Sequence, residues 1–173
     1  HAENLMLCFL FQDSMSHPGH TNLISKKRSK RMNNDTTLLN FIYQNVQMGQ
    51  TTIPQLLSSC TDQDFSRALR SQLNEYEQIG AEAARLLQKR GQSPDSVGPM
   101  AKMSSFVMTE MKTMQDSSVS HMAKMMVQGN TTGETTLLQH LRENDDADPE
   151  VARLGEKLLH TLKRNTEEMK KFL

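Results

Sequence analysis

The sequence predicts an all-α protein whose helices pack as a bundle of four main helices and one short helix. Apolar residues recur at spacings of three and four along most of the chain, which is the pattern of amphipathic helices. No run alternates apolar and polar β-branched residues in the way that predicts a strand. Trp is absent and Met occurs 13 times among 173 residues, which predicts an aliphatic, Met-rich core, because Met fits irregular gaps and favours helix.

The first helix is expected to begin after Asp35, which is a good N-terminal cap. Pro54 should kink this helix near its end, because proline removes a backbone donor, and Gly49 should be a point of close packing. The apolar stripe of this helix consists of Leu38, Leu39, Ile42, Val46, Gly49, Ile53 and Leu56.

The second helix is expected to begin at a cap formed by Thr61 with Asp64 and to end at Gly91. A shorter third helix is expected over residues 99–114, with its Met side chains facing inward. The apolar stripe of the second helix consists of Phe65, Leu69, Leu73, Tyr76, Ile79, Ala83 and Leu86.

Ser118 is expected to cap the fourth helix, which contains two glycines four residues apart, Gly129 and Gly133. Each glycine costs about 1 kcal/mol relative to alanine in a helix. A close helix crossing or a local kink must compensate for that cost. The last helix should be capped by Asp148, with Pro149 at its first position.

The first 31 residues differ in character from the rest. Five of the 20 basic residues fall between positions 26 and 31, whereas only two acidic residues precede position 32. The chain from 32 to 173 is therefore mildly acidic, which argues against nucleic-acid binding by this part. The domain organisation predicted is a disordered tail or translated upstream sequence over residues 1–31 and a helical bundle domain over residues 32–173.

The cellular location and the cofactor content are predicted from the apolar runs and the cysteines of the sequence. The apolar run at residues 5–11 is too short to span a membrane. Cys8 and Cys60 are far apart and lack the spacing of a zinc or redox motif, so a reducing compartment, the cytoplasm, is expected. We predict no cofactor and no membrane association.

Helical bundles that hold two metal ions supply carboxylates from facing helices and a repeated Glu-x-x-His motif. The repeat is missing here, because Glu75 is followed three residues later by Gln78 rather than His. The residues that could still bind a metal are Glu75, Glu134 and His160, whereas solvated helical polar residues are the more ordinary interpretation. The sequence contains no hydrolase motif, no phosphate-binding loop and no dinucleotide-binding loop. No catalytic residue is therefore predicted.

The part from Met32 to Leu173 resembles a group of uncharacterised ferritin-like helical-bundle proteins of spore-forming bacteria, distantly akin to spore-coat proteins. The resemblance rests on residues 38–45 (LLNFIYQN) with 47–49 (QMG), 118–123 (SVSHMA) with 128–129 (QG), 148–151 (DPEV) and 169–173 (MKKFL). It implies a ferritin-like up-and-down four-helix bundle in a bacterial, sporulation-linked setting. It does not imply ferroxidase activity, because Gln47 or Gln50, Gln78 and Asn165 stand in place of the carboxylate and His ligands.

The sequence is compatible with three functions. The leading hypothesis is a non-enzymatic structural or protein-interaction bundle that binds a protein partner or itself, in the cytoplasm or in the spore. The alternative is a divergent bundle that binds iron or manganese, or an oxidoreductase, using Glu75, Glu134 and His160. The third is a Met-rich groove for a partner helix or a small apolar ligand, which burial of Met103, Met111 and Met126 would oppose.

Overall fold

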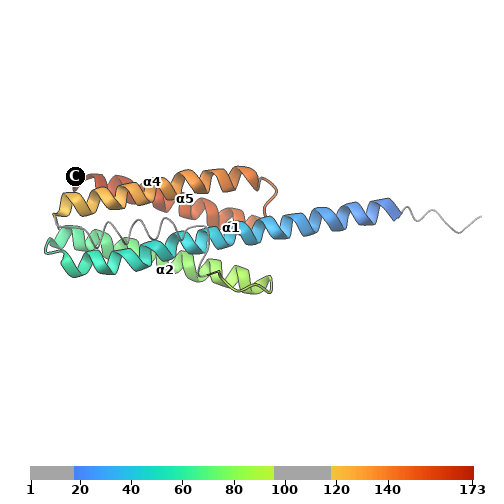
Figure 1. Cartoon of the computed structure of the whole chain (residues 1–173), viewed down its shortest axis with the longest axis horizontal. Helices are drawn as coiled ribbons and strands as arrows, with labels where there is room; N and C mark the ends of the chain where they lie inside the picture. Colours follow the sequence, from blue (N-terminus) through green and yellow to red (C-terminus); the bar gives the residue numbers. More distant parts are fainter. Residues whose placement is uncertain (1–17, 96–117) are drawn as a thin grey trace, which may run out of the picture. The chain divides into compact units, whose positions relative to one another are not determined.

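The computed structural model describes residues 18–95 and 118–173, with side chains from Ser25 onward. These residues form four helices and no strand (Figure 1): α1 (Pro18–Ser59), α2 (Gln63–Lys89), α4 (Val119–Glu143) and α5 (Pro149–Lys170). The predicted all-α class is thus confirmed for the described residues. The short helix predicted over residues 99–114 lies outside them.

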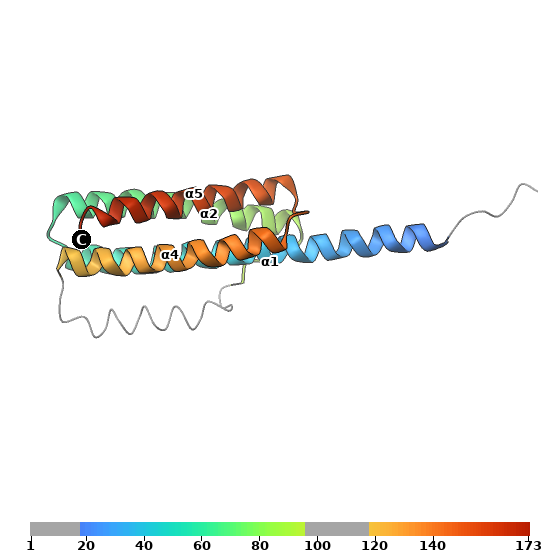
Figure 2. The same cartoon turned by 90° about the horizontal axis from the view of Figure 1, so that it is seen from above.

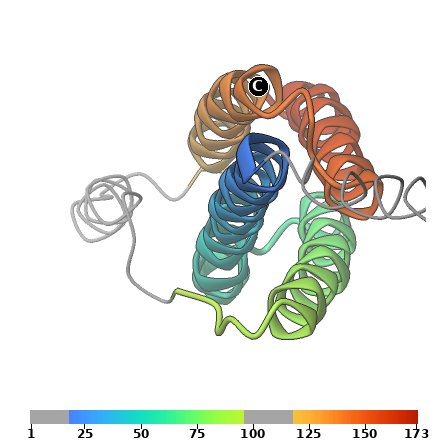
Figure 3. The same cartoon turned by 90° about the vertical axis from the view of Figure 1, so that its right-hand side faces the viewer.

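The chain divides into two compact units, His1–Lys30 and Arg31–Leu173, and the second unit contains the bundle. Within this unit each helix is antiparallel to both of its neighbours, so the bundle is of the up-and-down kind (Figure 2). Seen end-on, α1 lies beside α2 and α4, and α5 completes the square between α2 and α4 (Figure 3). Consequently α2 and α4, on one diagonal, run in the same direction.

The start of the first helix differs from the prediction. α1 begins at Pro18, so Asp35 lies inside the helix and is not its N-terminal cap. The hydroxyls of Thr36 and Thr37 donate to the carbonyls of Met32 and Asn33, each four residues earlier, as in continuous helix. α1 therefore includes residues 18–31 of the segment expected to be a tail, and the domain boundary at residue 32 stays a prediction.

The start of the second helix is shifted by one residue from the prediction. Asp62, not Thr61, caps α2, and its Oδ1 accepts the N–H of Phe65 at 2.8 Å. Aspartate is at least as good a cap as threonine, and the predicted cap at Thr61 was wrong by one residue. The predicted end is confirmed, because Gly91 has a φ of +71°, a left-handed conformation that favours glycine at a helix terminus.

The predicted caps of the last two helices are confirmed. The Ser118 side chain accepts the N–H of His121 at 3.3 Å at the start of α4. The Asp148 side chain accepts the N–H of Glu150 at 2.9 Å at the start of α5, where Pro149 is the first helical residue. These bonds satisfy backbone donors that have no partner within the helix.

One core fills the space between the four helices, and the predicted apolar stripes form most of it. Leu73 of the predicted second stripe is only half-buried, as are Leu141 on α4 and Phe172 after α5, whereas Met126 is 6% exposed. Packing onto this shared core, rather than intrinsic helix propensity, provides most of the stability of such helices. The buried apolar side chains are Leu38, Leu39, Phe41, Ile42, Val46, Ile53, Leu56, Phe65, Leu69, Tyr76, Ile79, Ala83, Leu86, Leu87, Met122, Ala123, Met126, Leu137, Val151, Leu154, Leu158, Leu159, Leu162 and Met169.

Two of the predicted glycine contacts are present and one is absent. A β-carbon on Gly49 would lie 2.4 Å from the Tyr76 ring, and one on Gly133 would lie 2.5 Å from the Asn45 amide. These glycines therefore let α1 approach α2 and α4 closely. Gly129 is exposed and has no neighbouring atom within 4 Å of such a β-carbon, so no close crossing explains it.

The segment that follows α2 is attached to α1. The Asn40 amide donates to the Asp95 carboxylate at 3.0 Å, and its oxygen accepts the Asp95 N–H at 3.2 Å. Gln44 donates to the Asp95 carbonyl at 3.2 Å. Across the described ranges, no helix has the length and apolar character needed to cross a membrane.

Candidate functional site

A layer of polar side chains crosses the interior of the bundle, near the middle of α2 and α4 and in the last third of α5. The Tyr76 hydroxyl, on α2, donates to Oδ1 of Asn130, on α4, at 2.8 Å. The amide of Asn165, on α5, donates to the same hydroxyl at 3.4 Å. Three helices thus meet in one buried hydrogen-bonded cluster, whose members are 3–4% exposed.

α1 supports this cluster from the fourth side. Gly49 provides the space in which the Tyr76 ring lies against α1. The Gln50 amide donates to the backbone carbonyl of Tyr76 at 3.0 Å. Because a side chain at position 49 would collide with the ring, the glycine fixes how closely α1 and α2 pack at this level.

Gln72 and Thr166 extend the buried polar region along α2 and α5. They are 2% and 7% exposed, respectively. We call the five residues Gln72, Tyr76, Asn130, Asn165 and Thr166 the polar layer. It contains amides and hydroxyls but no carboxylate, imidazole or thiol.

Burial raises the pKa of Tyr76 to about 12, because the charged phenolate is poorly solvated inside the protein. The hydrogen bond from Asn165 lowers this pKa and the nearby Glu75 raises it, but burial has the largest effect. The phenol is therefore a hydrogen-bonding group at neutral pH, not a proton acceptor.

The raised pKa predicts that the protein loses stability at alkaline pH. The folded state retains the Tyr76 proton up to about pH 12, whereas the unfolded state releases it near pH 10. The protonated Tyr76 hydroxyl therefore contributes fully to the free energy of unfolding below pH 10. Between pH 10 and 12 the free energy of unfolding should fall by roughly 3 kcal/mol in total. Urea denaturation of the wild type at pH 9 and pH 11 measures it.

Tyr76→Phe should remove this part of the pH dependence, and Tyr43→Phe, at a half-buried tyrosine on α1, should leave it in place. The Tyr76→Phe protein should also be less stable at pH 8 by about 1–3 kcal/mol, because Asn130 and Asn165 lose a buried partner. An unchanged difference between pH 9 and pH 11 in Tyr76→Phe would show that other groups cause the alkaline loss.

The three residues proposed from the sequence as metal ligands lie outside the polar layer. Glu75 is paired with Arg164, and Glu134 lies 3.8 Å from the Lys163 ammonium. His160 is exposed on α5. Glu75 on α2 and Glu134 on α4 therefore both pair with basic residues of α5. No group of three His, Cys, Asp or Glu side chains within residues 18–95 and 118–173 is arranged to hold a metal ion.

The amide residues that the resemblance places at ligand positions have separate locations. Asn165 belongs to the polar layer. Gln50 bonds the backbone of α2, Gln47 bonds within α1, and Gln78 is exposed. Only Asn165 among them faces the centre of the bundle with a polar partner there.

Most of the polar layer was not predicted from the sequence. Three of its residues interrupt or flank apolar stripes and belong to no recognisable motif, namely Asn130, Gln72 and Thr166. A usable signal existed: Gln72 precedes Tyr76 by four residues, as Leu69 precedes Leu73, so it lies on the same side of α2 as the core tyrosine. A polar residue on the core-facing side is the informative exception to an apolar pattern.

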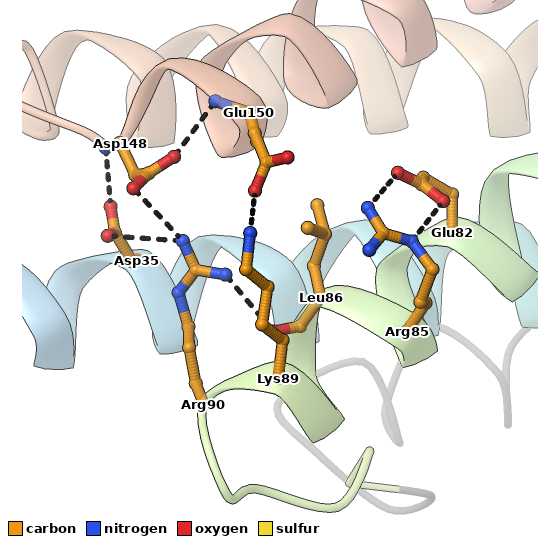
Figure 4. Close-up of polar contacts among 8 residues, drawn as sticks. All are labelled: Asp35, Glu82, Arg85, Leu86, Lys89, Arg90, Asp148 and Glu150. Carbon is orange, nitrogen blue, oxygen red and sulfur yellow. Dashed lines mark hydrogen bonds and ion pairs between the residues drawn. The ribbon is translucent and has the colours of Figure 1, made fainter.

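A second polar cluster ties the end of α2 to α1 and to the start of α5 (Figure 4). The Arg90 guanidinium lies 3.8 Å from the Asp35 carboxylate and 3.5 Å from that of Asp148, and it donates to the Leu86 carbonyl at 3.1 Å. Asp35 also accepts the backbone N–H of Asp148 at 3.0 Å. This contact, and not helix capping, is the role of Asp35.

The polar layer can hold helices in register and can bind a small neutral molecule, but its side chains offer neither a general base nor an anionic ligand at neutral pH. Compared with known proteins, the chain matches no protein-family model, no curated protein and no solved structure. The resemblance to ferritin-like proteins of spore-forming bacteria accordingly stays a prediction.

Proposed function

We propose that this chain is a non-enzymatic helical bundle with a structural or protein-interaction role, and that it associates with a second copy of itself. The observation that carries the non-enzymatic part is the composition of the polar layer. Amides and hydroxyls occupy the interior positions at which metal-binding bundles place carboxylates and imidazoles. The acidic candidates Glu75 and Glu134 are instead paired with basic residues of α5.

The charge distribution supports the interaction part. Residues 36–59 of α1 contain no acidic or basic residue, whereas α2 and α5 carry charged residues along their whole length. Charged residues are depleted at the centres of protein interfaces, because burying them costs desolvation energy. The uncharged outer face of α1 is therefore a surface that a second helical protein can cover at low cost.

We further propose a ferritin-like topology and a cytoplasmic or spore setting. Ferritin-like bundles join two antiparallel helix pairs through one long connection. The parallel directions of α2 and α4, and the length of the connection between residues 89 and 119, support that topology. The sporulation link rests on the sequence resemblance alone.

Sedimentation velocity of the full chain over a range of concentrations tests the self-association. Thr51 and Gln55 are exposed and one turn apart on α1, so Thr51→Lys with Gln55→Lys would place positive charges on the proposed face. We expect at least a tenfold weaker association, because a symmetric contact would contain these charges twice.

The matched control is Asn74→Lys with Gln78→Lys, which adds the same charges at exposed positions one turn apart on α2. It should associate as the wild type does. A wild-type chain that stays monomeric throughout would refute self-association, and equal effects of the two double variants would refute α1 as the contact surface.

The competing proposal is a divergent bundle that binds iron or manganese through Glu75, Glu134 and His160. It requires Glu75 and Glu134 to exchange their present partners, Arg164 and Lys163, for a metal ion. The third option, a Met-rich groove, is weakened by the burial of Met126. Met103 and Met111 lie outside the described residues.

A further inference from the structure

Four atoms of the polar layer are buried without a protein hydrogen-bond partner. They are Nε2 and Oε1 of Gln72, Nδ2 of Asn130 and Oγ1 of Thr166. A buried polar group without a partner costs about 1–3 kcal/mol. Since buried polar groups in folded proteins are nearly always paired with protein or ordered water, four such atoms in one bundle require a common explanation.

The ion pairs of α5 show that the three residues lie at one level of the bundle. The ion pair between Glu75 and Arg164 sets the level of α2 relative to antiparallel α5. Gln72 lies three residues before Glu75, and Thr166 lies two residues after Arg164. Because the helices run in opposite directions, Gln72 and Thr166 lie almost opposite each other. At a rise of about 1.5 Å per residue, the two positions differ in level by less than one turn.

The same reasoning places Asn130 at this level. The pair Glu134–Lys163 aligns antiparallel α4 and α5. Asn130 lies four residues before Glu134, and Thr166 lies three residues after Lys163. Three helices thus bring unpaired polar atoms to one cross-section of the core.

The hydrogen bonds already formed limit what can pair these atoms. Oδ1 of Asn130 accepts from the Tyr76 hydroxyl, so the amide of Asn130 is held with its nitrogen as the free end. Gln72 lies one turn from Tyr76 on α2, and both of its amide atoms are free. The unpaired set contains two amide donors, one amide acceptor and one hydroxyl that can do either.

This mixture selects the ligand. A cation would meet amide N–H groups and an anion would meet the Gln72 oxygen, and either charge would be costly to bury. A small neutral molecule that both donates and accepts satisfies all of them. We propose that the polar layer is a binding site for at least one internal water molecule, held between Gln72, Asn130 and Thr166.

The test is oxygen-17 magnetic relaxation dispersion of water in solutions of the full chain, which counts long-lived internal water oxygens and is insensitive to hydroxyl proton exchange. Gln72→Leu removes two of the four unpaired atoms and fills the space with an apolar side chain. Gln78→Leu makes the same change at an exposed position of α2 and is the matched control.

We expect Gln72→Leu to lower the number of long-lived waters per chain by at least one relative to both the wild type and Gln78→Leu. Equal numbers in the three proteins would overturn the proposal, because no long-lived water would then depend on Gln72. Thr166→Val, which removes one hydroxyl at nearly constant volume, provides the same comparison if Gln72→Leu does not fold, and an unchanged count there would also overturn it.

Discussion

Arg90→Met is expected to destabilise the protein by roughly 3 kcal/mol. Asp35 is 4% exposed, and Arg90 is its cationic partner, at 3.8 Å. Removing the guanidinium leaves this carboxylate buried without a compensating charge, and the Leu86 carbonyl also loses its side-chain donor. Methionine keeps most of the apolar stem, so the loss comes from the charge rather than from packing.

A double-mutant cycle separates the two contributions. Asp35→Asn retains an oxygen for the N–H of Asp148 but removes the charge, so Arg90→Met with Asp35→Asn should recover much of the lost stability. Urea denaturation at pH 7 measures all members of the cycle. The control is Arg85→Met at the exposed ion pair with Glu82, where little change is expected. Similar losses for Arg85→Met and Arg90→Met would refute the special role of Arg90.

Gly49→Ala is expected to destabilise the protein by about 2 kcal/mol, although alanine is the better helix former by about 1 kcal/mol. The added β-carbon would lie 2.4 and 2.5 Å from two carbons of the Tyr76 ring, closer than atoms can approach. The ring cannot turn away freely, because its hydroxyl is bonded to Asn130. α1 and α2 must therefore separate at the level of the polar layer, at the cost typical of overpacking.

Gly129→Ala is the matched control and should have the opposite sign. Gly129, like Gly49, lies inside an α-helix, but a β-carbon on Gly129 would have no neighbouring atom within 4 Å. We expect it to stabilise the protein by up to about 1 kcal/mol through helix propensity alone. Thermal or urea unfolding of both variants measures the contrast. Stabilisation by both substitutions would contradict the close contact between Gly49 and Tyr76.

The fold was predictable from the sequence wherever a local rule determined it. The apolar stripe of α1, the cap at Asp148 and the left-handed end at Gly91 all depend on a few neighbouring residues, and all were predicted correctly. The start of α1 was not, because Asp35 resembles a cap locally. Its actual partners, Arg90 and the backbone of Asp148, are distant in the sequence.

The candidate site was less predictable, because it depends on which helices become neighbours. Metal-ligand patterns in a sequence consist of charged side chains and so indicated Glu75 and Glu134, which the bundle pairs with basic residues of α5. Asn130 and Gln72 become notable only when α2, α4 and α5 are aligned and no protein partner remains for their amides. No local pattern encodes that alignment.

Whether the bundle binds metal is decided by the iron, manganese and zinc content of the full chain, purified from its natural host without added metal. We predict metal well below one ion per chain, with no change in the Glu134→Ala variant. The polar layer would then be a structural feature of a binding protein. Metal near one or two ions per chain in the wild type, lost in Glu134→Ala, would instead establish a metal-binding bundle with the carboxylates as ligands.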